Sequence, residues 1–361
     1  MQQELKVLLI GLGLMGGSLG LALRESSRVY SIMGFDSDPV AVLKAIDMGI
    51  IDRSVSLESG VPEADIIFLC TPLGSYTALL GSIRAGLQSG TIISDVGSTK
   101  EEVMKLFQAL PDQVWGIGGH PMAGSEIKGI HGADRYLFEN AVYCLTPAPG
   151  LSNSVLDSLV DLLNVTGARI KIMDAAVHDE LVAAVSHIPH LAAVALVNLT
   201  GGSDAHLMMA AGGFRDTTRI ASSNPEIWND IIFFNRNHIL NKLDSLINNL
   251  HTLRDALASS DADYINEELN RAKSIRDKIP RIHRGLIPSF YDIVCIVPDK
   301  PGIIGQLGFI LGQEDINIVD IEILRVREGD GGTIRLGVPS ESDAQKAVTV
   351  LKSHDIKAWM R

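Results

Sequence analysis

The sequence predicts an α/β protein in which a doubly wound sheet is followed by an all-helical domain and then by a small βαββαβ ferredoxin-like module. Apolar runs alternate with helical patterns from residue 6 to about 173. Apolar residues then recur at three- and four-residue spacing to about 279, and strand-like runs return from residue 289. A chain of 361 residues is also too long for one ordinary core. We therefore expect three domains, at 1–173, 174–280 and 289–361.

The first expected strand ends in a glycine motif. Residues 6–10 read KVLLI, and GLGLMG follows at 11–16, ahead of an apolar helical pattern. Gly11 would permit a tight turn, Gly13 would let the backbone approach a pyrophosphate, and Gly16 would let the helix pack closely on the strand. The motif predicts a Rossmann-type dinucleotide site formed by Gly11, Leu12, Gly13, Leu14, Met15 and Gly16.

An acidic residue follows the second expected strand. Asp36 comes directly after the run 29–35 and 20 positions after Gly16, where a carboxylate would accept hydrogen bonds from the adenosine ribose. Its charge would repel a 2′-phosphate, and Ser37, Asp38 and Pro39 offer no arginine to neutralise one. We therefore expect NAD rather than NADP, the alternative being a glycine turn in some other α/β protein.

The sheet should place polar residues at one edge. Its expected strands are 5–10, 29–35, 65–70, 91–95, 114–117, 141–146 and 168–172, mostly continuous apolar runs typical of buried parallel strands. Ligands of such sheets bind beyond the carboxyl ends of the strands. Three of these ends carry polar and glycine-rich segments, at 71–74, 95–100 and 118–126, and Thr71 and Pro72 are expected walls of the adenosine site.

The middle of the chain reads as helical. Segments 227–258 and 261–279 carry apolar residues on one side and polar residues on the other, so we expect them to pack on each other and on a second subunit. Two prolines, Pro280 and Pro288, mark a linker after them.

The last part of the chain has a βαββαβ pattern: strand 290–297, helix 302–313, strand 316–327, turn 328–332, strand 333–338, helix 342–353 and strand 356–360. The segments VPDKPGII at 297–304 and DINI at 315–318 resemble the ACT domain, a module that commonly binds amino acids between paired copies. A ferredoxin-like module without a ligand is the alternative.

Composition excludes several classes of protein. The net charge of −12 and the pI near 5.3 argue against binding to nucleic acid or to anionic membranes. No export signal is visible, and the three cysteines are far apart in apolar surroundings, which indicates a reducing compartment, the cytoplasm. The alanine-rich run 182–199 contains Ser186, His187 and His190, so we expect a buried core helix there rather than a membrane span.

His120 is the candidate general base. It follows two glycines at a strand end on the expected cofactor side of the sheet, and imidazole titrates near neutral pH. A structural histidine is an equal alternative from position alone. His187 and His190 have a spacing that invites a zinc interpretation, but no third ligand accompanies them, so we expect no metal.

Five segments in sequence resemble the prephenate dehydrogenase family of tyrosine biosynthesis: GLGLMGGS at 11–18, DVGSTK at 95–100, GHPMAGSE at 119–126, SHIPH at 186–190 and GFRDTTR at 213–219. With the ACT-like module, the arrangement is similar to that of feedback-controlled members of the family. We find no preceding chorismate mutase segment and expect a monofunctional form.

The resemblance implies an NAD-dependent oxidative decarboxylation of prephenate to 4-hydroxyphenylpyruvate. His120 would accept the proton of the C4 hydroxyl, and Ser98 would hydrogen-bond that hydroxyl or His120 and touch the nicotinamide; Ser98 also fits a helix N-cap with Glu101. Arginine matches carboxylate geometry, so Arg219 is the expected substrate anchor. The other expected substrate contacts are His190, Glu126, Asp216 and Trp228, whereas His187 would be structural.

The ACT resemblance implies a homodimer inhibited by tyrosine. The expected effector site combines the helix start at Asp299, Pro301, Gly302 and Ile303 with the amide of Asn317. Three alternatives stay open: an arogenate dehydrogenase, a β-hydroxyacid dehydrogenase, for which the helix 180–199 lacks the expected lysine, and a sensor without turnover.

Overall fold

The computed structural model describes residues 4–124, 127, 129–279, 291–298, 300–324 and 332–360. The chain forms two compact units, Met1–Pro280 and Arg281–Arg361, which are described separately.

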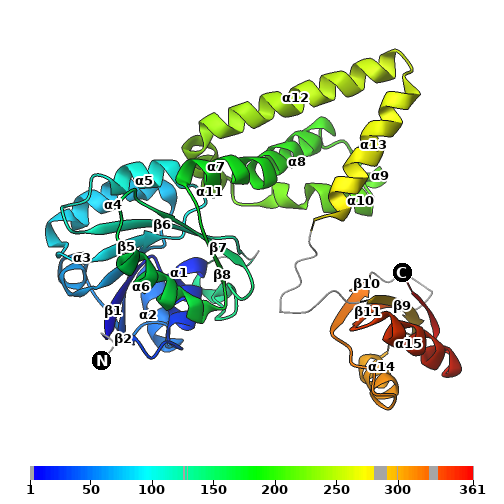
Figure 1. Ribbon diagram of the computed structural model, residues 1–361, viewed down its shortest axis with the longest axis horizontal. Coiled ribbons are helices and arrows are strands. Elements are labelled where there is room, and N and C mark those ends of the chain that lie inside the picture. The colour runs from blue at the N-terminus through cyan, green and yellow to red at the C-terminus, as the bar shows by residue number, and fades with distance from the viewer. Residues whose placement is uncertain are drawn as a thin grey trace. The chain divides into compact units, whose positions relative to one another are not determined.

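The first unit is built on an eight-stranded sheet with strand order β3-β2-β1-β4-β5-β6-β7-β8 (Figure 1). The strands are β1 (Leu5–Ile10), β2 (Val29–Phe35), β3 (Arg53–Ser54), β4 (Ile66–Leu69), β5 (Ile92–Asp95), β6 (Trp115–Pro121), β7 (Val142–Pro147) and β8 (Arg169–Ile172). Neighbouring strands run parallel except β6 and β7. The strand order reverses between β1 and β4, and ligands of doubly wound sheets bind beyond that point.

Helices cover both faces of this sheet. One core contains α1 (Leu14–Leu23), α2 (Pro39–Asp47) and α6 (Asn153–Leu163), and the other contains α3 (Leu57–Gly60), α4 (Tyr76–Ile83) and α5 (Glu101–Phe107). Alternate residues of β1 enter the two cores, Val7 and Leu9 on one side and Leu8 and Ile10 on the other. This explains why residues 7–10 are apolar without interruption.

The sheet differs from the sequence prediction in three ways. The strand β3 was not predicted, because Arg53 and Ser54 are exposed and polar. The expected strand 114–117 continues to Pro121, so His120 lies inside β6 rather than after it. Finally, β7 is antiparallel to β6, although parallel units were expected throughout; an apolar run does not encode strand direction.

The rest of the first unit is helical: α7 (Ala175–Val182), a π-helical turn (Ala183–His187), α8 (Ile188–Leu199), α9 (Asp204–Met209), α10 (Gly212–Thr218), α11 (Pro225–Phe234), α12 (Arg236–Ala258) and α13 (Ala262–Asp277). The expected segment 227–258 is divided between α11 and α12 at Asn235, a buried residue with its own polar contacts. Several apolar side chains of α12 and α13 remain exposed in the single chain, among them Leu250, Leu257 and Leu269.

One helix among the described residues, Ala175–Leu199, is long and apolar enough to cross a membrane by length and composition, and 33% of its most apolar window is buried. Four of its residues are buried polar side chains: His178, Asp179, His187 and His190. Two of them bond to residues of β6 and α5, as detailed below, so this helix is a core element of the unit.

The second unit is a four-stranded antiparallel sheet with order β10-β11-β9-β12. Its elements are β9 (Tyr291–Val297), α14 (Ile303–Gly312), β10 (Asp320–Leu324), β11 (Gly332–Val338), α15 (Glu341–Ser353) and β12 (Lys357–Met360). Both helices share one apolar core with the sheet. The predicted βαββαβ order is confirmed, although β10 begins at Asp320 rather than at 316. The end of that predicted strand and most of the predicted turn 328–332 lie outside the described residues.

Candidate functional site

The glycine loop between β1 and α1 has the steric features that the motif predicts. Gly11 has φ +99°, and a Cβ on it would lie 2.7 Å from the carbonyl of Cys70. A Cβ on Gly16 would lie 1.9 Å from the carbonyl oxygen of Gly11. Gly13, by contrast, faces open space and precedes α1, whose N-cap has no side-chain hydrogen bond. The loop therefore offers an anion an approachable backbone at a helix N-terminus.

Asp36 lies beside this loop. One carboxylate oxygen accepts a hydrogen bond from the backbone N–H of Leu12 at 2.7 Å, and the other accepts from Asp38 N–H at 2.9 Å. The sequence separates Asp36 from the loop by a whole helix, and the pairing of β1 with β2 brings them together.

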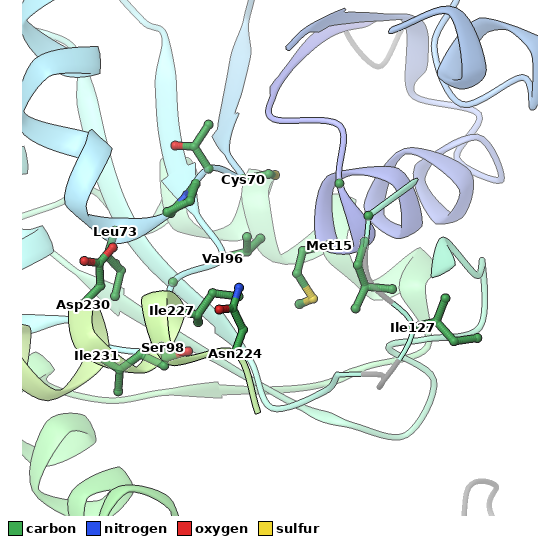
Figure 2. Close-up of a pocket in the computed structure, with 16 residues that line it drawn as sticks. Met15, Cys70, Leu73, Val96, Ser98, Ile127, Asn224, Ile227, Asp230 and Ile231 are labelled. Atoms are coloured by element: carbon green, nitrogen blue, oxygen red, sulfur yellow. The ribbon is translucent and has the colours of Figure 1, made fainter. Parts of the chain in front are cut away.

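A cavity of about 410 Å³ opens at this edge of the sheet (Figure 2). Its walls come from the glycine loop, from the ends of β4 and β5, and from α11. They are formed by Gly13, Leu14, Met15, Cys70, Thr71, Pro72, Leu73, Val96, Gly97, Ser98, Ile127, Gly129, Asn224, Ile227, Asp230 and Ile231. Asp230 also accepts a hydrogen bond from Gly74 N–H at 2.9 Å, which fastens α11 to the sheet.

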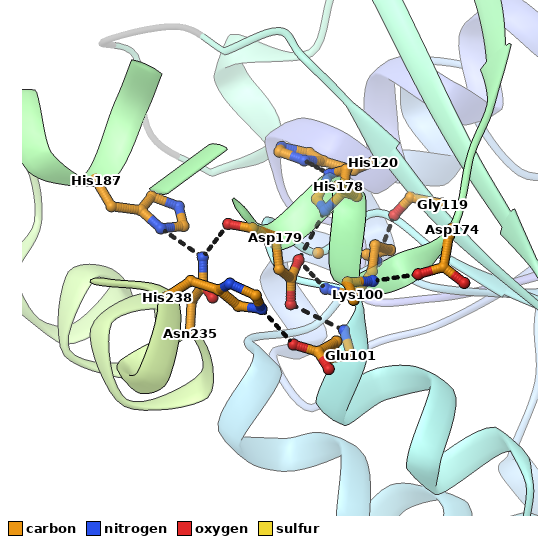
Figure 3. A network of polar contacts seen from close by, with 12 residues as sticks. Lys100, Glu101, Gly119, His120, Asp174, His178, Asp179, His187, Asn235 and His238 are labelled. Atoms are coloured by element: carbon orange, nitrogen blue, oxygen red, sulfur yellow. Dashed lines mark hydrogen bonds and ion pairs between the residues drawn. The ribbon is translucent and has the colours of Figure 1, made fainter. Parts of the chain in front are cut away.

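His120 is buried in β6, with 8% of its surface exposed. Its Nδ1 lies 2.8 Å from Nε2 of His178, and Nδ1 of His178 lies 2.7 Å from a carboxylate oxygen of Asp179 (Figure 3). Burial, together with the neighbouring His178, Lys100 and His187, holds the pKa of His120 well below its usual value. The imidazole is therefore neutral near pH 7 and able to accept a proton.

A buried ion pair lies behind the same strand ends. The ammonium of Lys100 contacts the carboxylate of Asp95 and donates to the carbonyl oxygen of Gly119 at 2.6 Å. Asp95 also accepts from the backbone N–H groups of Gly97 at 2.8 Å and Gly119 at 2.9 Å. Burial lowers the pKa of Lys100, and the pairing with Asp95 opposes that shift. The pair thus holds the residues that precede both Ser98 and His120.

The helical part contributes a second histidine pair. His190 stacks on Trp228 with ring centroids 3.5 Å apart, and His187 meets the same indole edge-on at 5.9 Å. Burial lowers the pKa of His187 to about 4. Burial also lowers the pKa of His190, and a hydrogen bond to the backbone of Ile220, next to Arg219, opposes this. Asn235 donates to the carbonyl oxygen of Asp179 at 2.8 Å and lies 3.1 Å from Nδ1 of His187.

The predicted residues fall into separate groups. Ser98, Thr71, Pro72 and the glycine loop line the cavity, and His190 lies against Trp228. Arg219 and Asp216 are exposed and precede Trp228 in the sequence. Glu126 lies outside the described residues. The alternative role of Ser98 as a helix cap is wrong, because α5 begins at Glu101 with Lys100 as its N-cap.

Sequence reasoning missed the residues that support the site. The sequence analysis gave no role to Asp95 and Lys100, which lie in the segment 95–100. It also did not identify His178, Asp179 and Asn235 as site residues. The available signal was a His-Asp pair nine residues before His187 on the same apolar helix.

The second unit carries the predicted helix start. Gly302 has φ +87° and precedes α14 without a side-chain cap, after Pro301 and before Ile303. Asn317 is exposed, three residues before β10 rather than at its start. Asp299 lies outside the described residues.

Family models match three consecutive parts of the chain. They are the prephenate dehydrogenase nucleotide-binding domain at 19–172, the prephenate dehydrogenase dimerization domain at 174–271 and the ACT domain at 291–355.

Individual proteins agree with these matches. The chain is 38% identical to a prephenate dehydrogenase of Bacillus subtilis, over 96% of this chain and 95% of that one. Among solved structures, prephenate dehydrogenase of A. aeolicus with hydroxyphenyl propionate and NAD+ has a TM-score of 0.71 at 30% identity, covering 77% of this chain and 99% of that one. Arogenate dehydrogenase of Synechocystis has a TM-score of 0.66 at 30% identity, covering 76% and 100%. The chain belongs to the prephenate dehydrogenase family and is an NAD-dependent oxidoreductase.

Proposed function

We propose that this chain oxidises and decarboxylates prephenate to 4-hydroxyphenylpyruvate with NAD+ as hydride acceptor. The observation that carries the proposal is the neutral, buried His120 and its link to Ser98. Asp95 accepts hydrogen bonds from Gly119, the residue before His120, and from Gly97, the residue before Ser98. The base in β6 and the cavity-lining hydroxyl, three residues after the adjacent strand β5, are thereby held at neighbouring strand ends.

The residues present fit a dinucleotide. The open backbone at Gly13 and the uncapped start of α1 suit a pyrophosphate, and Gly11, Leu12, Leu14, Met15 and Gly16 complete that loop. We assign Asp36 to the adenosine ribose, and Thr71 and Pro72 to the adenosine walls. When bound there, NAD+ accepts the hydride that leaves C4 of the substrate.

His120 carries the proton chemistry. Its Nε2 accepts the C4 hydroxyl proton as the carbonyl forms, and Ser98 holds that oxygen by a hydrogen bond. The ring carboxylate then leaves as CO2, and its bonding electrons make the ring aromatic. His120 returns the proton to the new phenolic oxygen, so the histidine ends the cycle neutral.

A dianionic substrate needs positive charge and a shaped pocket. We assign Arg219 to a substrate carboxylate, since guanidinium binds carboxylate through two hydrogen bonds. We assign the stacked rings of His190 and Trp228 to a flat wall of the substrate pocket. We assign Asp216 and Glu126 to substrate binding.

The ACT module gives the protein an amino-acid site. We assign it to tyrosine, with the ligand carboxylate at the start of α14, around Asp299, Pro301, Gly302 and Ile303, and with Asn317 completing the site. We place the protein in the cytoplasm as a homodimer, with domains at 1–173, 174–280 and 289–361. Tyrosine and prephenate should then weaken each other's binding reciprocally, and Asn317→Ala should weaken inhibition by tyrosine without altering turnover in its absence.

The test of the main activity is NADH formation with NAD+ and either prephenate or arogenate. Turnover of prephenate at the higher kcat/KM supports the proposal. Preference for arogenate would favour the second candidate, which the similarity to the Synechocystis arogenate dehydrogenase keeps open. Absence of turnover with both would overturn the assignment.

A further inference from the structure

We infer that His178 and Asp179 are positioning residues that fix the tautomer of His120 and stabilise the positive charge that His120 acquires during turnover. The inference rests on the proposed function for His120. These two residues, with His120, are called the buried triad below.

The contacts in the buried triad define where each proton lies. A carboxylate only accepts hydrogen bonds, so the 2.7 Å contact from Asp179 places a proton on Nδ1 of His178. In neutral His178 the other nitrogen, Nε2, is then an acceptor. Nδ1 of His120, 2.8 Å away, must be the donor. The remaining lone pair of His120 is therefore on Nε2, where a base needs it.

The buried triad is held firmly. Asp179 is fully buried, and its two carboxylate oxygens accept from the backbone N–H groups of Lys100 at 2.7 Å and Glu101 at 2.9 Å. The side chain of Asn235 binds the carbonyl oxygen of Asp179 at 2.8 Å. These bonds orient the carboxylate toward His178, which is itself 1% exposed (Figure 3). The start of α5 therefore orients His120 in β6 through Asp179 and His178 of α7.

The surrounding charges give Asp179 an electrostatic task. His120 becomes an imidazolium when it takes the substrate proton, and burial, the ammonium of Lys100 and the nearby His187 all oppose that charge. Asp95 is paired with Lys100, which leaves Asp179, acting through His178, as the carboxylate aligned with His120. No proton leaves the buried triad in this scheme: the one accepted at Nε2 of His120 returns to the phenolic oxygen.

The kinetic test compares three variants with prephenate and NAD+. His178→Leu removes the acceptor for His120 and should lower kcat by about 100-fold, with little change in KM, because base catalysis is typically worth about 10²- to 10⁴-fold. His178→Gln supplies an amide oxygen as a substitute acceptor and should recover part of that loss. Asp179→Asn removes the charge, so the low-pH limb of the kcat profile should move to lower pH.

His238→Gln is the matched control. His238 lies at the same helical junction, and its side chain bonds to Glu101 at 2.6 Å rather than to a member of the buried triad. We expect its kcat and its pH profile to match those of the wild type. If Asp179→Asn and His238→Gln lower kcat equally and neither moves the low-pH limb, Asp179 serves only folding and the inference fails.

A measurement without turnover separates this inference from the proposed function. Nitrogen-15 labelling of the histidine rings should show the His120 ring protonated at Nδ1 and not at Nε2 in the wild type, and a mixture of tautomers in Asp179→Asn. An Nε2-protonated His120 in the wild type would overturn the inference whatever the substrate. Because these spectra are recorded on the wild type and on Asp179→Asn, they test the inference even if a His178 variant fails to fold. Inactivity of the wild type toward both substrates would instead overturn the proposed function.

Discussion

Lys100→Met removes one partner of a fully buried ion pair. The Lys100 side chain has no exposed surface, and its ammonium bonds to Asp95 and to the carbonyl oxygen of Gly119. The variant leaves the Asp95 carboxylate buried without a cation. Breaking a buried pair in this way costs about 3–5 kcal/mol. Asp95 keeps hydrogen bonds from Gly97 and Gly119, so we expect the lower end, about 3 kcal/mol.

Lys105→Met is the matched control on the same helix. The Lys105 side chain is 60% exposed and pairs with Glu102 at 2.6 Å. Exposed pairs contribute about 0–1 kcal/mol, so the two variants should differ by at least about 2 kcal/mol. The same methionine replaces the same residue type in both cases, which isolates the effect of burial.

The assay is urea unfolding followed by tryptophan fluorescence. Trp115 and Trp228 belong to the first unit and Trp359 to the second. A Trp359→Phe background therefore restricts the signal to the unit that contains Lys100. Equal destabilisation by Lys100→Met and Lys105→Met would refute the reasoning. A double variant with Asp95→Asn should be less destabilised than Lys100→Met, because no uncompensated charge remains.

Four further predictions use the same protein. His120→Asn should retain NAD+ binding, measured by titration, but lose about 10²- to 10⁴-fold in kcat, and a near-normal kcat would exclude His120 as the base. Arg219→Lys should mainly raise KM for prephenate, because an ammonium does not reproduce two guanidinium bonds; an unchanged KM would place Arg219 outside the pocket. Asp36→Ala should weaken NAD+ binding and relax discrimination against NADP+, and an unmoved preference would contradict its assignment to the ribose. Burial keeps His187 neutral in the folded state with a pKa of about 4, against an ordinary histidine pKa of 6.5, so the unfolded chain binds more protons as pH falls below 6.5. Stability should therefore drop by about 2 kcal/mol between pH 7 and pH 5 through this residue, and His187→Gln should remove that part of the pH dependence of urea unfolding.

Local patterns in the sequence predicted the buried strands and the glycine loop, because a short run of residues identifies each of them. Residues 7–10 and 66–69 are apolar because both faces of their strands are covered, and Gly11 and Gly16 are glycine because a Cβ would collide with backbone. The residues that express these constraints, an apolar run or a glycine spacing, stand within a few positions of one another, so one sequence displays them. The two-residue strand β3 and the antiparallel direction of β7 depend on pairing with distant segments, and no local pattern encodes them.

The supporting residues of the site were missed for the same reason. His120 and His178 are 58 residues apart, and Lys100 and Asp179 are 79 apart, so their contacts arise only when α7 docks on the sheet. His120 was recognisable because glycines and a strand end surround it in the sequence. The partners that fix its protonation are ordinary buried helix residues until the fold brings them behind it.

The position of α7 links the fold to the chemistry. The carboxylate of Asp179 accepts hydrogen bonds from the start of α5, and its carbonyl oxygen accepts one from Asn235, the residue before α12. The neighbouring His178 contacts the ring of His120. A shift of the helical part against the sheet would therefore change the hydrogen bonds of the base itself, since all these contacts cross between them. Polar contacts buried at this junction fix the position of the helical part against the sheet. An apolar interface of the same size would define that position less specifically. The same contacts that dock the helices thus determine which nitrogen of His120 is free to accept a proton.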